Sequence, residues 1–151
     1  MAHMSDNWLL FVPSDPIWQP SDEAAQKAAA LLATFVGDAE IVTERTEHIE
    51  IVHPFANWDG VECPSCRTDV DEWFHDVGLK IWEGSSFTRL DCVLPCCGLP
   101  TSLNELHFIM PTAFGRFVLE AMNPESDTTP EQERQLSETI GAPLLKVWRH
   151  L

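Results

Sequence analysis

Five cysteines carry the clearest chemical signal in this sequence of 151 residues. Cys63 and Cys66 belong to a Cys-Pro-Ser-Cys segment, and this spacing lets two thiolates reach one metal ion from a tight turn. Further along, Cys96 and Cys97 are adjacent and are followed by Gly98, which lets the backbone turn beneath the sulfurs. Two such turns can supply the four soft ligands of a tetrahedral site. We therefore expect these four cysteines to bind a structural zinc ion.

The fourth ligand of this site is open to alternatives, because adjacent cysteines rarely bind one ion together. Cys92 and His75 are the alternatives. Cys92 shares a face of a predicted strand with Leu90 and Leu94, a position typical of a small buried hydrophobic residue. A histidine beside an apolar helix face, as His75 is, more often packs or faces solvent than binds metal.

Disulfides and redox catalysis are the other chemistries open to these thiols. An odd number of cysteines without a secretory segment favours a reducing compartment, so we expect a cytoplasmic protein. The Cys-Pro-Ser-Cys segment is similar to the redox site of glutaredoxin-like proteins, where the motif opens a helix directly. Here Arg67 and Thr68 precede the predicted cap at Asp69, and the acids that follow would raise a thiol pKa. Zinc is the favoured hypothesis, and a thiol oxidoreductase or thiol-based metal sensor is the alternative.

Capped helices and short strands surround the cysteines. We expect a helix from the Ser21 cap to Gly37, one from about Asp69 to Glu83, and one capped by Thr129 and ended by Gly141. Apolar runs and alternation predict strands at 8–12, 40–42, 48–52, 87–94, 116–121 and 144–150, and a helical turn at 102–105.

The two ends of the chain share one plan of strand, capped helix, glycine and strand. Each end predicts a β-α-β unit, so we expect a mixed sheet with parallel neighbours and with helices on one face. The predicted class is α+β, of a ferredoxin-like type, with a metal-binding insertion at about residues 55–105. Residues 1–4 are interpreted as a vector remnant, which leaves 5–151 as a single domain.

Several segments resemble a group of small, uncharacterised bacterial proteins that pair a CPxC knuckle with a PCCG turn and an SLNxL segment. The resemblance covers residues 55 to 151 and is carried by 55–66, 95–98, 101–106, 114–117 and 120–124. It implies a metal role for Cys63, Cys66, Cys96 and Cys97, and it implies no activity. The middle of the chain is also similar in part to zinc-ribbon domains, although the second CPxC of those domains is replaced here.

The chain is strongly acidic, with 24 Asp and Glu against nine Lys and Arg and a net charge of −15. This charge argues against nucleic acid and anionic membranes as partners. Residues 1–62 alone hold eleven acids and two bases. Such a run usually forms a solvated surface, and the functional alternative is a patch that attracts a basic protein.

The sequence contains no phosphate-binding loop, nucleophile elbow or HExxH pair, so we favour a non-enzymatic role. We expect a zinc-stabilised protein-interaction module, of an immunity or adaptor type, that binds a basic partner. The candidate contact residues are Trp18, Trp58, Trp82 and Asn104. Loop tryptophans more often pack on a core than serve as exposed anchors, and Asn104 could instead bond local backbone.

Overall fold

The structure is a computed structural model that describes residues 6–82 and 86–151. The predicted vector remnant at residues 1–4 lies outside this range. The elements are β1 (Asn7–Pro13), α1 (Asp22–Ala33), β2 (Glu40–Val52), β3 (Val61–Glu62), α2 (Asp71–Trp82), β4 (Asp91–Val93), β5 (Pro100–Ser102), the 3-10 helix η1 (Leu103–Glu105), β6 (His107–Phe108), β7 (Ala113–Met122), α3 (Pro130–Ile140) and β8 (Leu144–His150). The predicted α+β class is confirmed.

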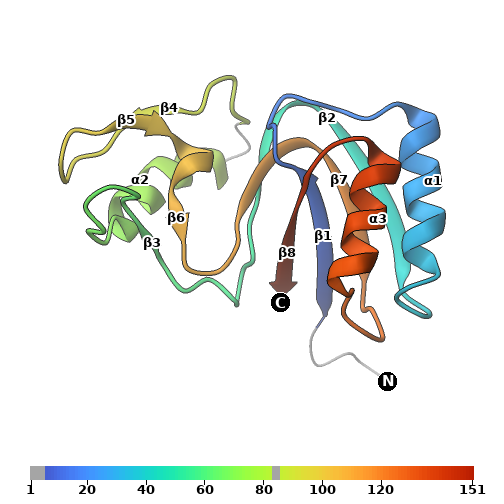
Figure 1. Cartoon of the computed structure of the whole chain (residues 1–151). Helices are drawn as coiled ribbons and strands as arrows, with labels where there is room; N and C mark the ends of the chain where they lie inside the picture. The colour runs from blue at the N-terminus through green and yellow to red at the C-terminus, as the bar shows by residue number, and fades with distance from the viewer. Residues whose placement is uncertain (1–5, 83–85) are drawn as a thin grey trace.

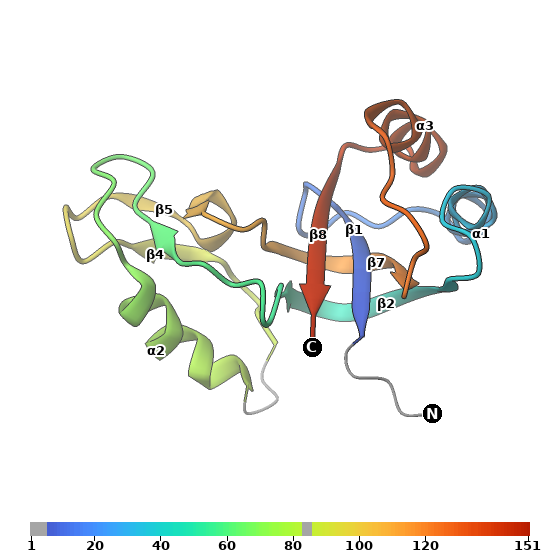
Figure 2. The same cartoon turned by 90° about the horizontal axis from the view of Figure 1, so that it is seen from below.

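Four strands form the main sheet, in the order β2-β7-β1-β8. Strand β1 is central and pairs with β7 on one side and β8 on the other, with Leu10 opposite both Glu120 and Val147. Helices α1 and α3 pack side by side on one face of this sheet (Figures 1 and 2). This strand order, reached through two β-α-β units, is the ferredoxin-like arrangement.

The expected parallel neighbours are wrong, because every strand pair that the described residues form within a sheet is antiparallel. The two β-α-β units are interleaved. Strand β7 lies between β1 and β2, and β1 lies between β7 and β8. Each helix therefore crosses over a strand of the other unit, and the parallel strands of one unit never become neighbours.

Local signals in the sequence define α1 and α3. Ser21 caps α1 by accepting a hydrogen bond from the Ala24 amide, and Thr129 forms a capping box with Gln132 at the start of α3. Gly141 ends α3 at φ 97°, a left-handed conformation that glycine adopts without strain. The two helices cover a core of sheet and helix side chains: Leu9, Phe11, Ala25, Ala28, Leu32, Val36, Phe117, Leu119, Ala121, Leu136 and Ile140.

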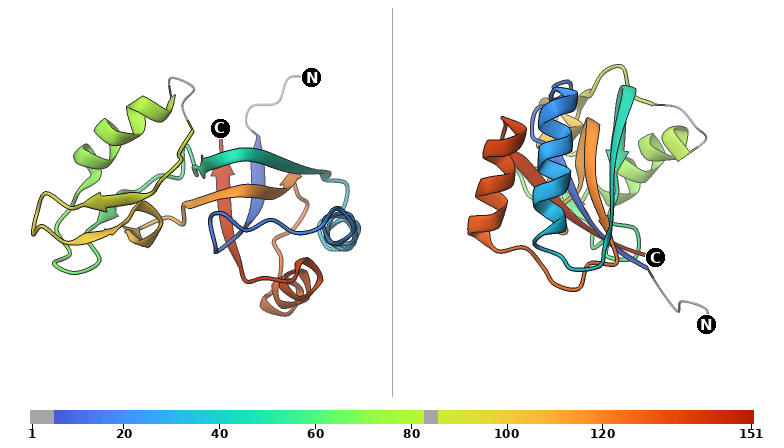
Figure 3. Two further views of the ribbon diagram at one scale, coloured as in Figure 1. Left: turned by 90° about the horizontal axis from the view of Figure 1, so that it is seen from above. Right: turned by 90° about the vertical axis from the view of Figure 1, so that its right-hand side faces the viewer.

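We call the main sheet and the two helices on it the sandwich. The chain leaves the sandwich after β2 and returns at β7, and the intervening segment 53–112 lies beside the sandwich (Figure 3). It contains α2 and two small sheets, β3-β6 and β4-β5. Its side chains share a second core with residues of β2 and β7, consisting of Ile49, Val61, Cys63, Val70, Phe74, Leu90, Leu94, Leu103, Leu106 and Phe114. We call residues 53–112 the insertion, and the predicted range 55–105 falls inside it.

The C-terminal strand joins the insertion to the sandwich. The Ala56 amide donates to the His150 carbonyl at 2.9 Å, and Arg149 Nε donates to the His53 carbonyl at 2.8 Å. The Arg149 guanidinium also lies 4.4 Å from the centre of the Phe55 ring. Strand β8 therefore fixes the start of the insertion, which keeps the insertion in a defined place.

Several predicted element bounds differ from the structure. Helix α1 ends at Ala33, with Thr34 as its C-cap, rather than at the predicted stop Gly37. The strands expected at 40–42 and 48–52 form the single strand β2, whose register against β7 shifts between Arg45 and Glu50. The strand expected at 87–94 is restricted to β4, because that is the length over which β5 pairs with it. Helix α2 begins at Asp71, just after the predicted cap Asp69, whose carboxylate accepts a hydrogen bond from the Asp71 amide. Its predicted end at Glu83 lies outside the described residues.

Candidate metal centre

We call the turn that carries Cys63 and Cys66 the first knuckle and the turn that carries Cys96 and Cys97 the second knuckle. The two knuckles converge, with all four Sγ atoms within 4.8 Å of one another. Cys66 Sγ lies 3.4 Å from Cys96 Sγ, Cys63 Sγ lies 3.7 Å from Cys97 Sγ, and the Sγ atoms of Cys96 and Cys97 are 3.9 Å apart. A tetrahedron with metal–sulfur bonds of about 2.3 Å has edges of about 3.8 Å. The cysteines are not joined by disulfides. The arrangement therefore fits one tetrahedral metal ion.

The first knuckle is a turn closed at both ends by backbone hydrogen bonds. The Cys63 amide donates to the Thr68 carbonyl at 2.9 Å, and the Arg67 amide donates to the Cys63 carbonyl at 3.0 Å. Arg67 has a φ of 64°, in the left-handed region that the turn requires. The amides of Ser65 and Cys66 approach Cys63 Sγ at 3.4 and 3.5 Å, which favours the thiolate form.

The second knuckle has the same pattern of backbone hydrogen bonds as the first. The Leu94 amide donates to the Leu99 carbonyl at 3.0 Å, and the Gly98 amide donates to the Leu94 carbonyl at 2.9 Å. Gly98 has a φ of 73° and corresponds to Arg67. Cys97 then corresponds to Cys66. The two knuckles are equivalent turns related by a shift along the chain.

This equivalence explains how adjacent cysteines contribute two ligands. Leu94 stands where the first knuckle has Cys63, and both side chains are fully buried in the core of the insertion. Cys96 stands where the first knuckle has Ser65. The fourth sulfur is therefore supplied two residues later than in a regular C-x-x-C knuckle, and Cys96 still reaches the other three sulfurs.

The thiols differ in their readiness to ionise. The hydroxyl of Thr68, 3.1 Å from Cys66 Sγ, and the Thr68 backbone lower the pKa of Cys66 to about 6. Burial opposes ionisation of Cys63, but the Cys66 and Ser65 amides hold its pKa below the ordinary value. Loss of solvent and contacts with the other thiols raise the pKa of Cys96 to about 12. Four neighbouring thiolates repel one another, so a bound cation is what allows all four to ionise.

The two alternative ligands lie outside the cluster. Cys92 is half-buried on β4 and packs against the core of the insertion, and burial raises its pKa. His75 on α2 has its Nδ1 2.9 Å from the Asp71 carbonyl and 3.5 Å from a carboxylate oxygen of the same residue. The structure therefore brings together the four predicted ligands and leaves Cys92 and His75 in other contacts.

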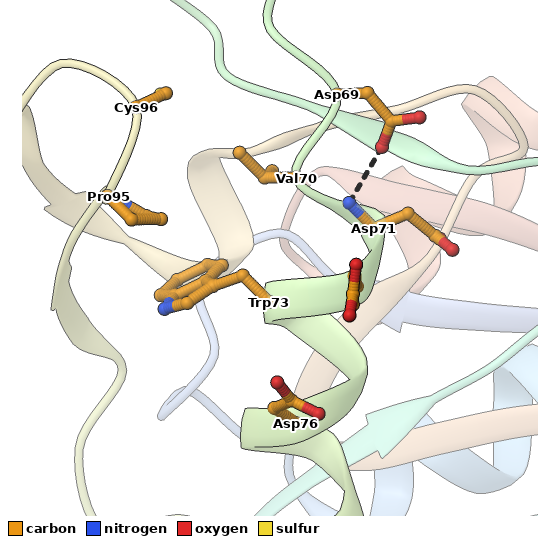
Figure 4. A pocket seen from close by; sticks show the side chains of 8 residues that line it. Asp69, Val70, Asp71, Trp73, Asp76, Pro95 and Cys96 are labelled. Atoms are coloured by element: carbon orange, nitrogen blue, oxygen red, sulfur yellow. Dashed lines mark hydrogen bonds between the residues drawn. The ribbon is translucent and has the colours of Figure 1, made fainter.

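An acidic pocket of about 640 Å³ adjoins the cluster, between α2 and the second knuckle. Figure 4 shows the Trp73 ring extending from α2 toward Pro95 on the loop that carries Cys96. Its lining also includes four carboxylates and Val70, and the full set is Asp69, Val70, Asp71, Glu72, Trp73, Asp76, Pro95 and Cys96. Cys96 thus contributes to the sulfur cluster and to the wall of this pocket.

The predicted partner contacts occupy different environments. Trp18 is half-buried against the sandwich core. Trp58 is stacked between His53 and Phe74, at 4.8 and 5.4 Å between ring centres, and its Nε1 donates to Asp71 Oδ1 at 2.7 Å. Asn104 is half-buried on η1 and lines a groove with Asp91 and Ser102. The Trp82 side chain lies outside the described residues. Partner binding by these residues stays a prediction.

Sequence reasoning missed the residues that support the sulfurs. These are Thr68, which contacts Cys66, and Leu94, which replaces a ligand. An alignment of Cys63-Pro64-Ser65-Cys66-Arg67 with Leu94-Pro95-Cys96-Cys97-Gly98 would have revealed that Leu94 takes the place of Cys63, because the prolines and the second cysteines of the two segments coincide.

No protein-family model, curated protein or solved structure matches the chain. The resemblance to small bacterial proteins with a CPxC knuckle therefore stays a prediction. In the part of the chain that the structure describes, no helix combines the length and apolar character that crossing a membrane requires.

Proposed function

We propose that the four cysteines bind one zinc ion and that this ion has a structural role. The supporting observation is the convergence of four sulfurs at tetrahedral spacing. A donor set made only of thiolates favours zinc or iron over hard cations, and four protein ligands fill a tetrahedral shell. Elemental analysis of protein purified without a chelating resin is expected to give one zinc per chain. Iron in its place would overturn the assignment.

We infer further that the protein is a non-enzymatic interaction module, in which the metal holds the insertion and an acidic surface binds a basic protein. The net charge of −15 supports this, because opposite charge accelerates and orients association. On the sandwich, β2 carries Glu44, Glu47 and Glu50, of which the first two are exposed. These carboxylates belong to the acidic N-terminal part of the chain.

Charge reversal tests this surface against the overall charge. The probe is a synthetic peptide rich in lysine and arginine, titrated at low and at physiological salt. We expect lysine at Glu44, Glu47 and Glu50 to weaken binding strongly and added salt to weaken it further. The matched control places lysine at Asp59, Glu72 and Asp76 on the insertion, which changes the net charge equally. Binding that ignores salt, or that falls equally in both variants, would contradict a β2 surface.

A further inference from the structure

We propose that the metal centre is a redox switch, in which a hydroperoxide oxidises Cys96 and Cys66 then forms a disulfide with it across the two knuckles. This inference rests on the proposed metal site and assigns a regulatory chemistry to its sulfurs. The observations that carry it are the exposure of the individual sulfurs, the distances between them, and the pocket beside Cys96.

Access differs among the four sulfurs. Cys63 is fully buried, whereas Cys66, Cys96 and Cys97 are exposed. Cys96 also lines the pocket of about 640 Å³ between α2 and the second knuckle (Figure 4). A small oxidant entering that pocket therefore meets Cys96, and the displaced position of this ligand in its knuckle is what places it there.

The lining of the pocket selects the type of oxidant. Glu72 and Asp76 are exposed, and with Asp69 and Asp71 they give the pocket four carboxylates. Their field repels anions such as oxidised glutathione and leaves neutral molecules unaffected. A neutral hydroperoxide is therefore the class of oxidant that this pocket admits.

The distances identify the partner of Cys96. Cys66 Sγ lies 3.4 Å away and Cys97 Sγ lies 3.9 Å away. A disulfide between adjacent residues closes a small strained ring, so Cys97 is the poorer partner although it is close. Cys66 comes from the other knuckle and faces no such constraint. The expected disulfide therefore joins the two knuckles.

The chemistry balances with the hydroperoxide as the sole oxidant. The Cys96 thiolate attacks one peroxide oxygen, so an S–O bond forms, the O–O bond breaks, and the alkoxide or hydroxide that leaves takes a proton from water. The Cys66 thiolate then attacks the sulfur of the sulfenic acid, and hydroxide leaves as the S–S bond forms. Two thiolates lose two electrons, and the hydroperoxide is reduced to an alcohol, or water, plus water.

Oxidation leaves Cys63 and Cys97 as the remaining thiolates, which are too few for a closed tetrahedral site. Because the disulfide crosses from one knuckle to the other, the two turns stay joined after the metal is lost. The oxidised insertion is therefore a distinct and reducible state rather than an unfolded one.

The experiment treats the purified, zinc-loaded full chain with hydrogen peroxide, follows zinc release with a chromogenic chelator, and maps disulfides by peptide mass spectrometry. We expect release of one zinc per chain, a disulfide between Cys66 and Cys96, and recovery of zinc binding after the disulfide is reduced. Cys92→Ser is the control and should behave as the parent. Retention of zinc, or a Cys96–Cys97 or Cys63–Cys66 linkage, would overturn the proposal.

A second measurement tests the pocket. In Glu72→Gln/Asp76→Asn, the rate of oxidation by oxidised glutathione is expected to rise about fivefold at low salt, and the rate with hydrogen peroxide should not change. Equal rates in parent and variant would remove the pocket from the account. A chain purified without zinc would contradict the proposed function, and disulfide mapping on that chain would still decide the pairing of Cys66 with Cys96.

Discussion

Leu94 occupies in the second knuckle the position that Cys63 occupies in the first, and both side chains are fully buried. The backbone hydrogen bonds of the two turns correspond, with Cys63 to Thr68 matched by Leu94 to Leu99. The turn is therefore maintained without a cysteine at its first position. An apolar side chain contributes packing there, and Cys96 supplies the sulfur from the exposed side of the turn.

The first prediction concerns the transfer of the fourth ligand from position 96 to position 94, the first position of the second knuckle. Cys96→Ser is expected to lower zinc affinity about a hundredfold, since one ligand of four accounts for about 3 kcal/mol of binding. The double variant Leu94→Cys/Cys96→Ser recreates a regular C-x-x-C turn and should recover affinity to within about tenfold of the parent. Competition with a zinc chelator measures both. Leu94→Ala/Cys96→Ser is the control and should stay weak, and a double cysteine variant that also stays weak would contradict the equivalence of the knuckles.

Removal of the metal should loosen the insertion selectively. The sandwich core between the helices and the sheet contains no cysteine, whereas Cys63 belongs to the core of the insertion. Chelation is therefore expected to increase amide hydrogen exchange in β3, α2 and β4, with β1 and the helix-facing part of β7 still protected. Hydrogen exchange with mass spectrometry measures this. An equal increase across the whole chain would show that the two parts unfold as one unit.

Acid should destabilise the junction through His53. Burial, followed by the charges of His75 and Arg149, lowers the pKa of His53 to about 4 against the opposing effect of Asp71. His53 Nδ1 accepts a hydrogen bond from the Phe55 amide at 2.8 Å, which requires an unprotonated Nδ1. The unfolded chain, with an ordinary pKa near 6.5, binds the proton more readily. The contribution of His53 is therefore complete above pH 6.5 and is lost as the pH falls toward 4.

Urea unfolding at pH 7 and pH 5 measures this loss, which linkage puts at about 2 kcal/mol between the two pH values. His53→Asn keeps an acceptor near the Phe55 amide and removes the titration, so its stability should fall by less. Both proteins are zinc-loaded, and protonation of the thiols then affects them equally. The same acid loss in parent and variant would remove His53 from the explanation.

Close packing in the sandwich gives a prediction at Gly115 on β7. A Cβ at this position would lie 2.6 Å from Val12 Cγ1, and Val12 is fully buried. Gly115→Ala is therefore expected to lower the free energy of unfolding by about 1–3 kcal/mol through overpacking. Val12→Ala removes the Cγ1 methyl that the added Cβ would meet, so the loss in the double variant should be smaller than the sum of the two single losses. Strict additivity in a denaturation cycle would contradict a direct clash.

Local signals predicted the elements well and their pairing poorly. The Thr129 capping box and the alternation of Phe117, Leu119 and Ala121 are short-range patterns, and the structure confirms both. The position of β7 between β1 and β2 depends on contacts between distant segments, and no residue spacing in a single sequence encodes such contacts. Parallel neighbours within a mixed sheet were the natural inference from two β-α-β units, and the interleaving of those units made that inference wrong.

The cysteine cluster could be predicted by type and spacing, since Cys63 and Cys66 share a turn and the second pair has glycine behind it. The contacts that support the cluster could not be predicted in this way. Thr68 contacts Cys66 only because the turn closes back on itself, and Trp73 reaches Pro95 only because α2 packs beside the second knuckle. Both contacts arise from the fold of the insertion, so the structure is needed to find them.

Thiol protection in the native protein tests the proposed zinc site most directly. Native protein, purified without chelating resin, is treated with an alkylating agent before and after addition of a strong zinc chelator, and its mass is measured intact and after digestion. We expect one zinc per chain, with Cys63, Cys66, Cys96 and Cys97 unmodified until the chelator is added. A metal-free chain whose exposed cysteines Cys66, Cys96 and Cys97 react at once, with no effect of the chelator, would contradict it.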